Sequence, residues 1–333
     1  MTARPAARFG AIDRFVVPLD ARGAVRYFNH ALRVPHTLAQ RVLANIPGTP
    51  IPFRPTDDDA AELLRSMLGG EVAGVPLGDL RWIVLRDYER GTRGRLIAFF
   101  FRRDAAMPFA IAKARGAESG GESLRREARA LEEVRPRLSP EMQRTLPNLL
   151  RFQADERGEL LVLDVLPGRS AYVETQRSLL PSRHLHRHFT AAGQWLAEFH
   201  NSTRNGMTTA SHRDFWARNL LFDGARLGVI DWEHYTPTAS PLLDLFHFPT
   251  TYGQNYPWRR YRRARPAEAF ARTFVRDNAV SRAVRRYLDA YAKATGLQLK
   301  KAFDEYVDAR GYDVQGTRHL PWDELEAAVR SRS

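Results

Sequence analysis

The sequence predicts an α+β protein with two lobes: a small antiparallel β-sheet lobe with one main helix, and a larger lobe that is mainly helical. Short β-type runs around a single helical segment fill residues 79–166, and helical periodicity dominates from residue 167 onward. A chain of 333 residues is long enough to bury a core in each lobe. We therefore expect an N-terminal extension over residues 1–78, a small lobe over 79–166 and a large lobe over 167–333.

The extension carries mixed signals and indicates no function of its own. Its Pro-rich stretch IPGTPIPFRPTDDDAAELLRSMLGG predicts a loop followed by a short helix that Asp57 or Asp58 caps. Covering the small lobe and supporting a dimer are both open roles for this segment.

The small lobe is predicted from three β-type runs, one helix and two further runs. LRWIVLRDY and LIAFFF flank the turn ERGTRGR and predict a hairpin, and alternation in MPFAIAKA places Phe109, Ile111 and Lys113 on one face of a third strand. GGESLRREARALEEVRPRL then has helical spacing, and LLRFQA and ELLVLDVL predict two more strands. The Pro167-Gly168 pair that follows is expected to form the hinge to the large lobe.

The large lobe begins with FTAAGQWLAEFH, whose apolar residues form one stripe of a helix. The segment SHRDFWARNLLFDGARLGVIDWEHY then interrupts the helices with two short strands around Asp223-Gly224. From SPLLDLFHF to the end of the chain, helical patterns dominate again.

Composition excludes several classes of protein. Zero cysteines rule out disulfides and thiolate chemistry, and they are compatible with a reducing cytoplasm, which is the expected location. No apolar run reaches the roughly 18 residues that a membrane span needs. The net charge of +13 leaves peripheral membrane contact open, but the arginines are spread along the chain and no nucleic-acid-reading motif accompanies them. No nucleic-acid partner is therefore expected.

One set of polar residues suits phosphoryl transfer, which needs a base for the acceptor hydroxyl, ligands for Mg²⁺ and cations on the phosphates. His212-Arg213-Asp214 and Asn219 lie on one tight loop that leads into a strand, and Asp231 ends the later run LGVID. The side-chain oxygens of Asn219 and Asp231 suit Mg²⁺ as ligands, which leaves Asp214 to act as catalytic base.

Lys113 is one of only four lysines and the only one on a small-lobe strand, so we expect it to contact phosphate oxygens. Glu127 on the following helix is expected to hold its ammonium group; Glu118 and Glu122 compete for this role, but Glu127 lies deeper in the helix. Gly91 and Gly94 in ERGTRGR are candidate nucleotide contacts, although a plain hairpin turn has the same pattern.

The segments HRDFWARNLLF and VIDW resemble the aminoglycoside phosphotransferase and choline kinase superfamily, often called the phosphotransferase enzyme family. LRREARALEEVRPRL is similar to the family's Glu-bearing helix, LLVLDVLPGRS to its hinge and GQWLAEFH to its helix before the catalytic loop. SPLLDLFHF is similar to the segment that follows the metal-binding Asp. The resemblance covers roughly residues 80 to 250, and the order and spacing of these segments make it specific.

The resemblance implies a bilobal protein-kinase-like fold that binds ATP and Mg²⁺ between its lobes. The implied enzyme is a small-molecule kinase, which transfers the γ-phosphate of ATP to a hydroxyl of an aminoglycoside, sugar or amino-alcohol type of acceptor. In addition to the roles given above, it implies loop-shaping roles for His212, Arg213 and Asp244, and nucleotide contacts at the hinge residues Asp164 and Leu166. Two departures affect the acceptor side: Arg213 stands where the family usually has Gly, and Ala217-Arg218 where many members have Pro-Gly.

Several alternatives remain open at this level. A kinase acting on a lipid-linked or polysaccharide acceptor would suit the Arg-rich stretch over residues 258–265, and a pseudokinase would keep the fold as a binding module. His184 and His188 would share a helix face and could bind metal, but no third ligand is evident, so exposed histidines are the preferred interpretation. The acceptor, the choice of ATP over GTP and the oligomeric state do not follow from the sequence.

Overall fold

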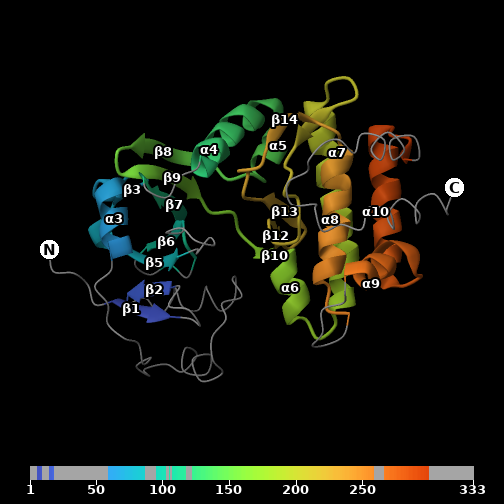
Figure 1. Ribbon diagram of the computed structural model, residues 1–333, viewed down its shortest axis with the longest axis horizontal. Coiled ribbons are helices and arrows are strands. Elements are labelled where there is room, and N and C mark those ends of the chain that lie inside the picture. Colours follow the sequence, from blue (N-terminus) through green and yellow to red (C-terminus); the bar gives the residue numbers. More distant parts are fainter. Residues whose placement is uncertain are drawn as a thin grey trace. The chain divides into compact units, whose positions relative to one another are not determined.

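The computed structural model describes residues 6–9, 15–18, 59–86, 95–102, 105, 107–117, 122–258 and 266–299. They divide into two compact units, shown in Figure 1. The sheet unit takes in the described residues up to Glu132 together with Pro147–Leu166, and the helical unit takes in Glu133–Leu146 and the described residues from Pro167 onward. The observed elements are those of the expected α+β fold: an antiparallel sheet in one unit and mainly helices in the other.

The sheet unit is built on a seven-stranded sheet in which every neighbouring pair is antiparallel. The strand order is β1-β2-β5-β6-β7-β9-β8. The five strands expected from the sequence are present, and two more extend the sheet beyond β5. Their bounds are β1 (Ala6–Phe9), β2 (Phe15–Pro18), β5 (Leu80–Arg86), β6 (Leu96–Arg102), β7 (Ala110–Gly116), β8 (Leu149–Asp155) and β9 (Gly158–Asp164).

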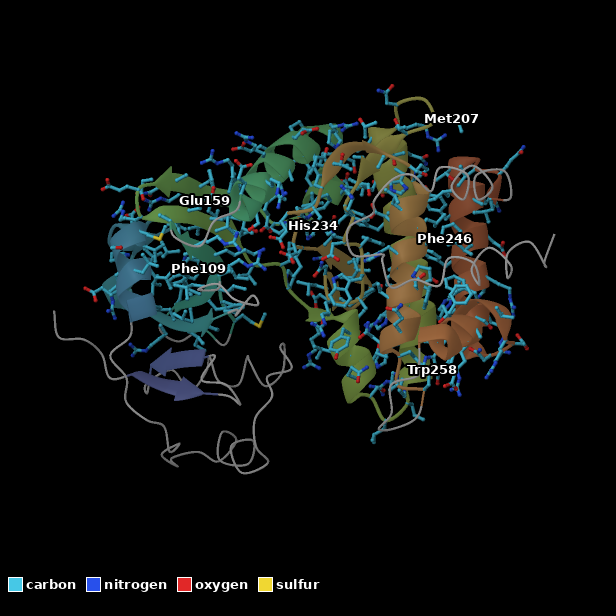
Figure 2. All side chains as sticks on the ribbon, in the orientation of Figure 1. Phe109, Glu159, Met207, His234, Phe246 and Trp258 are labelled. Carbon is cyan, nitrogen blue, oxygen red and sulfur yellow. The ribbon has the colours of Figure 1, made fainter. Side chains whose placement is uncertain are left out.

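The core of the sheet unit lies on one face of this sheet, where helix α3 (Asp59–Leu68) packs. Its Leu64, Met67 and Leu68 meet a cluster of strand side chains that includes Ala110, Ala112, Ala114, Leu160 and Val162. The small alanines at alternating positions of β7 leave room for the helix to approach closely. Phe109, labelled in Figure 2, precedes β7 and packs against this same cluster. The expectation that Phe109 shares a face with Ile111 and Lys113 is therefore wrong for Phe109.

The N-terminal boundary therefore differs from the one expected. The sequence separates residues 1–78 as an extension, whereas α3 contributes to the core of the sheet unit. The helix begins at Asp59, and its expected caps, Asp57 and Asp58, lie outside the described residues. Two short strands, β3 (Glu71–Val72) and β4 (Val75–Pro76), and a 3₁₀ turn (Leu77–Asp79) connect α3 to β5. The main helix expected after β7 is α4 (Ser123–Val134).

The helical unit contains the long helices α7 (Leu185–Thr203), α8 (Leu242–Asn255) and α10 (Ala279–Thr295). Its largest fully buried side chains are mainly aromatic and come from these helices and the loop between them: Phe189, Phe199, Phe215, Trp232, Phe248, Tyr287 and Tyr291. Gly193 of α7 permits close contact with α10, because a Cβ at this position would lie 3.0 Å from the ring of Tyr287. The apolar stripe expected over FTAAGQWLAEFH thus faces the core.

Shorter elements complete the helical unit. The strands are β10 (Arg169–Ser170), β11 (Thr209–Ser211), β12 (Leu220–Asp223), β13 (Arg226–Val229) and β14 (Thr236–Ala239). The short helices are α5 (Pro140–Gln143), α6 (Ala171–Arg177), α9 (Pro266–Phe270), 3₁₀ turns at Arg135–Arg137 and Pro181–His184, and a π-helical turn at Ala271–Val275. The long helical pattern from residue 266 is interrupted at Asn278, whose backbone is extended. Asn278 caps the start of α10, because its side chain accepts the Ser281 backbone N–H while the Ser281 hydroxyl accepts the Asn278 backbone N–H.

Among the residues that the structure describes, no helix combines the length and the apolar character required to cross a membrane.

Candidate active site

In the sheet unit, Lys113 of β7 and Glu127 of α4 form a buried ion pair. Lys113 Nζ donates hydrogen bonds of 2.8 and 2.6 Å to the two carboxylate oxygens, and the side chains are only 11% and 0% exposed. The face of β7 that carries Lys113 is opposite the alanines that pack on α3. Of the competing glutamates, Glu122 is exposed ahead of α4 and Glu118 lies outside the described residues. The strand and the helix thus fix a lysine ammonium by a charge-assisted bond.

In the helical unit, the loop His212-Arg213-Asp214 is held by the carboxylate of Asp244, in the first turn of α8. Asp244 is fully buried, and its two oxygens accept the backbone N–H groups of His212 at 2.7 Å and Arg213 at 2.8 Å. Arg213 has a φ of +61°, a left-handed conformation that L-residues other than Gly, Asn and Asp rarely adopt. The strained turn therefore persists because a buried anion holds both of its amides.

His212 is fixed in one tautomer by its neighbours. The Asp214 backbone N–H donates to His212 Nδ1 at 3.2 Å, so Nδ1 carries no proton, and Nε2–H donates to the Ile230 carbonyl at 3.1 Å. Complete burial lowers the pKa of His212, which keeps the ring neutral and consistent with this pattern. The ring therefore links the loop to the segment that leads to Asp231.

Asp214 and Asn219 contact each other across the loop. Asn219 Nδ2 donates to the Asp214 carboxylate Oδ2 at 2.7 Å and to the Asp214 carbonyl at 3.0 Å. These bonds orient the amide so that its oxygen, Oδ1, is the Asn219 atom that can bind a cation. The Asp214 side chain keeps 28% of its surface exposed, whereas Asn219 is buried. A solvent-accessible carboxylate beside a fixed amide is an arrangement suited to orienting a hydroxyl group.

The β12–β13 hairpin brings Asn219 and Asp231 to the same end. Leu220 pairs with Val229, and the ladder continues one step further, because the Ile230 N–H donates to the Asn219 carbonyl at 3.0 Å. Asp231 follows directly with a φ of +70°, which turns the chain sharply out of the hairpin. The two short strands expected around Asp223-Gly224 are thus present. Asn219 and Asp231, twelve residues apart in the sequence, come to adjacent positions at the end of the hairpin.

Sequence reasoning missed one neighbour of Asp214. His247 Nε2 lies 3.7 Å from Asp214 Oδ1, the carboxylate oxygen that Asn219 does not contact. His247 is on α8, three residues after Asp244, so one helix supplies both the brace of the loop and this imidazole. The helical spacing within SPLLDLFHF was the available signal, since residues three apart on a helix share a face.

The electrostatics behind the loop depend on a second buried histidine. Burial acts to raise the pKa of Asp244. Its polar neighbours outweigh burial and lower the pKa: the His200 ring, the His212 ring and the His212 backbone N–H. His200 Nε2 lies 3.8 Å from Asp244 Oδ2. Burial lowers the pKa of His200, whose Nδ1 lies 2.6 Å from the Tyr291 hydroxyl. Asp244 is therefore an ionised carboxylate within neutral, hydrogen-bonded surroundings.

The other positions expected to contact the nucleotide remain predictions. Gly91 and Gly94 lie outside the described residues. The Asp164 carboxylate accepts hydrogen bonds from the backbone and side-chain amides of Asn148, so it fastens the start of β8 to the end of β9. Leu166 follows β9 and is half-buried. The contacts with Asn148 are structural, and the expected nucleotide contact of Asp164 stays a prediction.

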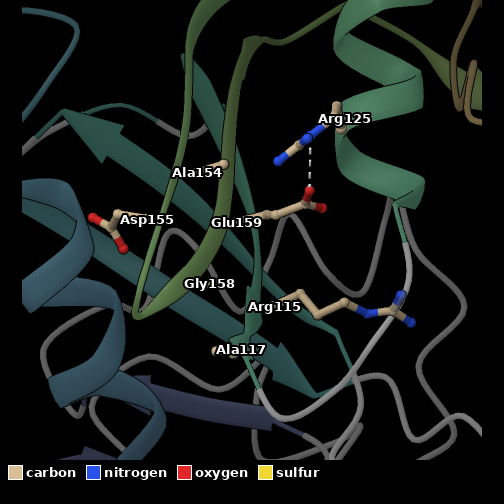
Figure 3. A pocket seen from close by; sticks show the side chains of 8 residues that line it. Arg115, Ala117, Arg125, Ala154, Asp155, Gly158 and Glu159 are labelled. Atoms are coloured by element: carbon tan, nitrogen blue, oxygen red, sulfur yellow. Dashed lines mark ion pairs between the residues drawn. The ribbon is translucent and has the colours of Figure 1, made fainter.

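The sheet unit also has a cavity of about 380 Å³ (Figure 3). Arg125 and Glu159 meet in it, with 3.4 Å between Arg125 Nε and Glu159 Oε1, while the Asp155 carboxylate points away in Figure 3. Gly158, with a φ of +131°, is required at its edge, because a Cβ there would lie 2.0 Å from the Arg115 carbonyl oxygen. The Arg115 side chain also lines the cavity, so two arginines lie there beside one inward carboxylate.

The donor set of the loop and hairpin fits a hard divalent cation. Asn219 Oδ1 and the Asp231 carboxylate offer oxygen atoms, which Mg²⁺ prefers as ligands over nitrogen or sulfur. The class that the fold and these residues define is that of phosphotransferases with an antiparallel sheet unit and a helical unit.

Comparison with known proteins agrees with this class. The model of the phosphotransferase enzyme family (APH) matches residues 117–291, more than half of the chain, and the chain belongs to this family. The family resemblance seen in the sequence is thereby confirmed. No sequence among curated proteins matches significantly. Among solved structures, the streptomycin–ATP–APH(2″)-IIa ternary complex matches with 14% identity over 76% of this chain and 89% of that chain. The TM-score of this match is 0.42.

Proposed function

We propose that this protein is an ATP-dependent O-phosphotransferase that moves the γ-phosphate of ATP to a hydroxyl group of a small-molecule acceptor. The observation that carries the proposal is the arrangement of Asp214, Asn219 and Asp231 on one loop and hairpin, with Asp244 bracing the loop. Membership of the phosphotransferase enzyme family supports the reaction type.

In the proposed reaction, the acceptor oxygen forms a bond to the γ-phosphorus while the bond from that phosphorus to the β,γ-bridging oxygen breaks. Asp214 orients the acceptor hydroxyl and takes its proton, and ADP leaves with the electron pair of the broken bond. The products are a phosphate monoester of the acceptor, ADP and the proton held by Asp214. His247, at 3.7 Å from Asp214 Oδ1, is placed to pass that proton to solvent.

Two sets of residues are proposed to bind the nucleotide and its metal ion. In the sheet unit, Lys113 contacts phosphate oxygens while Glu127 holds its ammonium in place. In the helical unit, Asn219 Oδ1 and the Asp231 carboxylate would hold Mg²⁺. When bound, Mg²⁺ supplies positive charge that offsets the negative charge of the phosphate oxygens.

The acceptor is proposed to be a small hydroxylated molecule of the aminoglycoside, sugar or amino-alcohol type. Asp214 keeps 28% of its side-chain surface exposed, so an acceptor hydroxyl can reach it from solvent. The fold by itself does not select among these acceptors, because one scaffold serves many substrates.

Incubation of the purified chain with Mg²⁺, γ-labelled ATP and a cell extract tests the proposal. The extract is separated afterwards into water-soluble, lipid and protein fractions. Label in a water-soluble compound, absent with Asp214→Asn, is the expected result. Label in lipid or protein would identify a kinase with a large acceptor instead, and bound Mg-ATP without transfer in any extract would favour a binding module.

A further inference from the structure

Three side chains of the helical unit that have no role in the proposed reaction converge at the start of α7. Glu174 comes from α6, His184 from the 3₁₀ turn before α7, and His188 from the first turns of α7. Their ligand atoms all lie within 4.8 Å of one another. His188 Nε2 lies 2.8 Å and His184 Nδ1 3.9 Å from Glu174 Oε2. Two imidazole nitrogens and a carboxylate oxygen are the ligand set of many zinc sites.

Hydrogen bonds behind His188 decide which of its nitrogens carries the proton. Thr175 uses its single hydroxyl proton on the Ala171 carbonyl at 2.7 Å, so Tyr252 must donate in the 3.1 Å contact between the two hydroxyls. Tyr252 then has no proton left for His188 Nδ1 at 3.0 Å, and the ring must donate to it. Nδ1 therefore carries a proton, and a neutral His188 presents the lone pair of Nε2 to Glu174.

This assignment requires a cation beside Glu174. An imidazole lone pair and a carboxylate oxygen 2.8 Å apart repel each other unless a proton or another cation lies with them. Arg187 supplies positive charge at this point: one guanidinium nitrogen bonds Glu174 Oε2 and lies 3.5 Å from both His184 Nδ1 and His188 Nε2. All three ligand atoms thus surround a single cationic nitrogen.

We propose that Glu174, His184 and His188 form a site for a divalent transition metal of the Zn²⁺ class, in which the metal replaces the Arg187 guanidinium. Arg187 is 33% exposed and can turn into solvent. Tyr252 keeps His188 Nδ1 protonated, the outer-shell arrangement that a histidine bound through Nε2 needs. His184 binds through Nδ1 after Arg183, which donates to its Nε2 and is exposed, turns away. The fourth position is open to water or ligand.

Metal binding at this site is connected to the β12–β13 hairpin. Arg187 donates to the Gly224 carbonyl in the hairpin turn at 3.1 Å, and its guanidinium lies 5.3 Å from the ring of Phe222. Replacement of Arg187 by a metal releases both contacts. None of the residues of this site is itself assigned to the proposed phosphotransfer.

Titration of the untagged full chain with Co²⁺, followed by visible absorption and then by displacement with Zn²⁺, tests the site. One Co²⁺ per chain with a four- or five-coordinate spectrum is expected. His184→Ala and Glu174→Gln should each weaken binding about tenfold or more. His186→Ala is the matched control, since this histidine is on the same helix but exposed, and it should leave binding unchanged.

Arg187→Gln gives a second, independent measurement. Because this substitution removes the competing cation, Co²⁺ affinity should rise by about tenfold, while circular dichroism shows the fold intact. Absence of a Co²⁺ spectrum in the parent chain, an equal loss with His186→Ala and His184→Ala, or weaker binding with Arg187→Gln would each overturn the proposal. These results would leave the Arg187 guanidinium as the cation of the cluster.

Discussion

Asp214 Oδ2 accepts a hydrogen bond of 2.7 Å from Asn219 Nδ2, while Asp214 Oδ1 faces His247 at 3.7 Å. The two carboxylate oxygens therefore have different neighbours, an amide on one side and an imidazole on the other. Oδ2 is held in place by Asn219, whereas Oδ1 is the oxygen that we propose takes the proton of the acceptor hydroxyl. The difference between the two oxygens also gives Asp214 a role that an uncharged side chain of equal shape would not fill.

Asp214→Asn tests that role directly. The new amide oxygen still accepts from Asn219, so the loop should keep its shape, but the group no longer takes a proton. We expect kcat for the labelled acceptor to fall by about 10²- to 10⁴-fold, with Mg-ATP affinity largely retained. Asp223→Asn, at the exposed end of the same hairpin, is the control and should keep full activity. Equal activity in the Asp214 variant and the parent would remove Asp214 from the mechanism.

Variants of the Lys113–Glu127 pair should affect the free energy of unfolding and the affinity for ATP differently. Lys113→Met leaves a fully buried carboxylate without its ammonium, so the free energy of unfolding should drop by about 3 to 5 kcal/mol. The double variant Lys113→Met, Glu127→Gln also removes the buried negative charge of Glu127. In a urea titration it should recover more than half of the lost free energy of unfolding. ATP affinity should remain low in the double variant. Full recovery of ATP affinity would show that Lys113 does not contact the nucleotide.

Asp244 predicts a stability effect at a residue far along the chain from the loop that it holds. The Asp244 carboxylate accepts two backbone N–H groups, and in Asp244→Asn an amide N–H₂ would face one of these two donors. Because that donor loses its acceptor, the free energy of unfolding should fall by about 2 to 4 kcal/mol. Asp277→Asn, an exposed carboxylate paired with Arg282 and Arg285, should leave the denaturation midpoint unchanged. Matching midpoints for the two variants would contradict the bracing role of Asp244.

Buried histidines predict loss of stability in mild acid. Burial lowers the pKa of His200 and His212, so the folded chain binds fewer protons than the unfolded chain once the pH falls below the ordinary histidine value of 6.5. Each ring then lowers the free energy of unfolding by up to about 1.4 kcal/mol per pH unit. His184 and His188 have lowered pKa values too and add to the slope.

Urea denaturation between pH 7.5 and 5, with chelator present, measures this slope. The lowered pKa values of Glu174 and Asp244 act only below the ordinary values of 4.5 and 3.8, so they do not contribute in this window. His186→Asn, which replaces an exposed ring, should not change the curve. A free energy of unfolding that stays constant from pH 7.5 to 5 would be incompatible with neutral buried rings.

Local patterns in the sequence were sufficient for the elements that carry the chemistry. Alternation and turn residues predicted β5, β6, β7, β8 and β9, because a strand with one face on a core needs that period. The spacing of Asp214, Asn219 and Asp231 indicated a loop followed by a hairpin, since those residues flank two short β-type runs. Lys113 and Glu127 could be paired because a strand and the next helix in sequence are usually neighbours.

Only the tertiary structure decided which distant groups meet. The sequence by itself determined the α+β class, the family and the candidate loop, since these depend on residues close together in the chain. It did not determine that α3 packs on the sheet, that His247 faces Asp214, or that Glu174 joins His184 and His188. Such contacts depend on how helix faces pack against one another, and a pattern with a period of 3.6 residues specifies that a face is buried without specifying its partner.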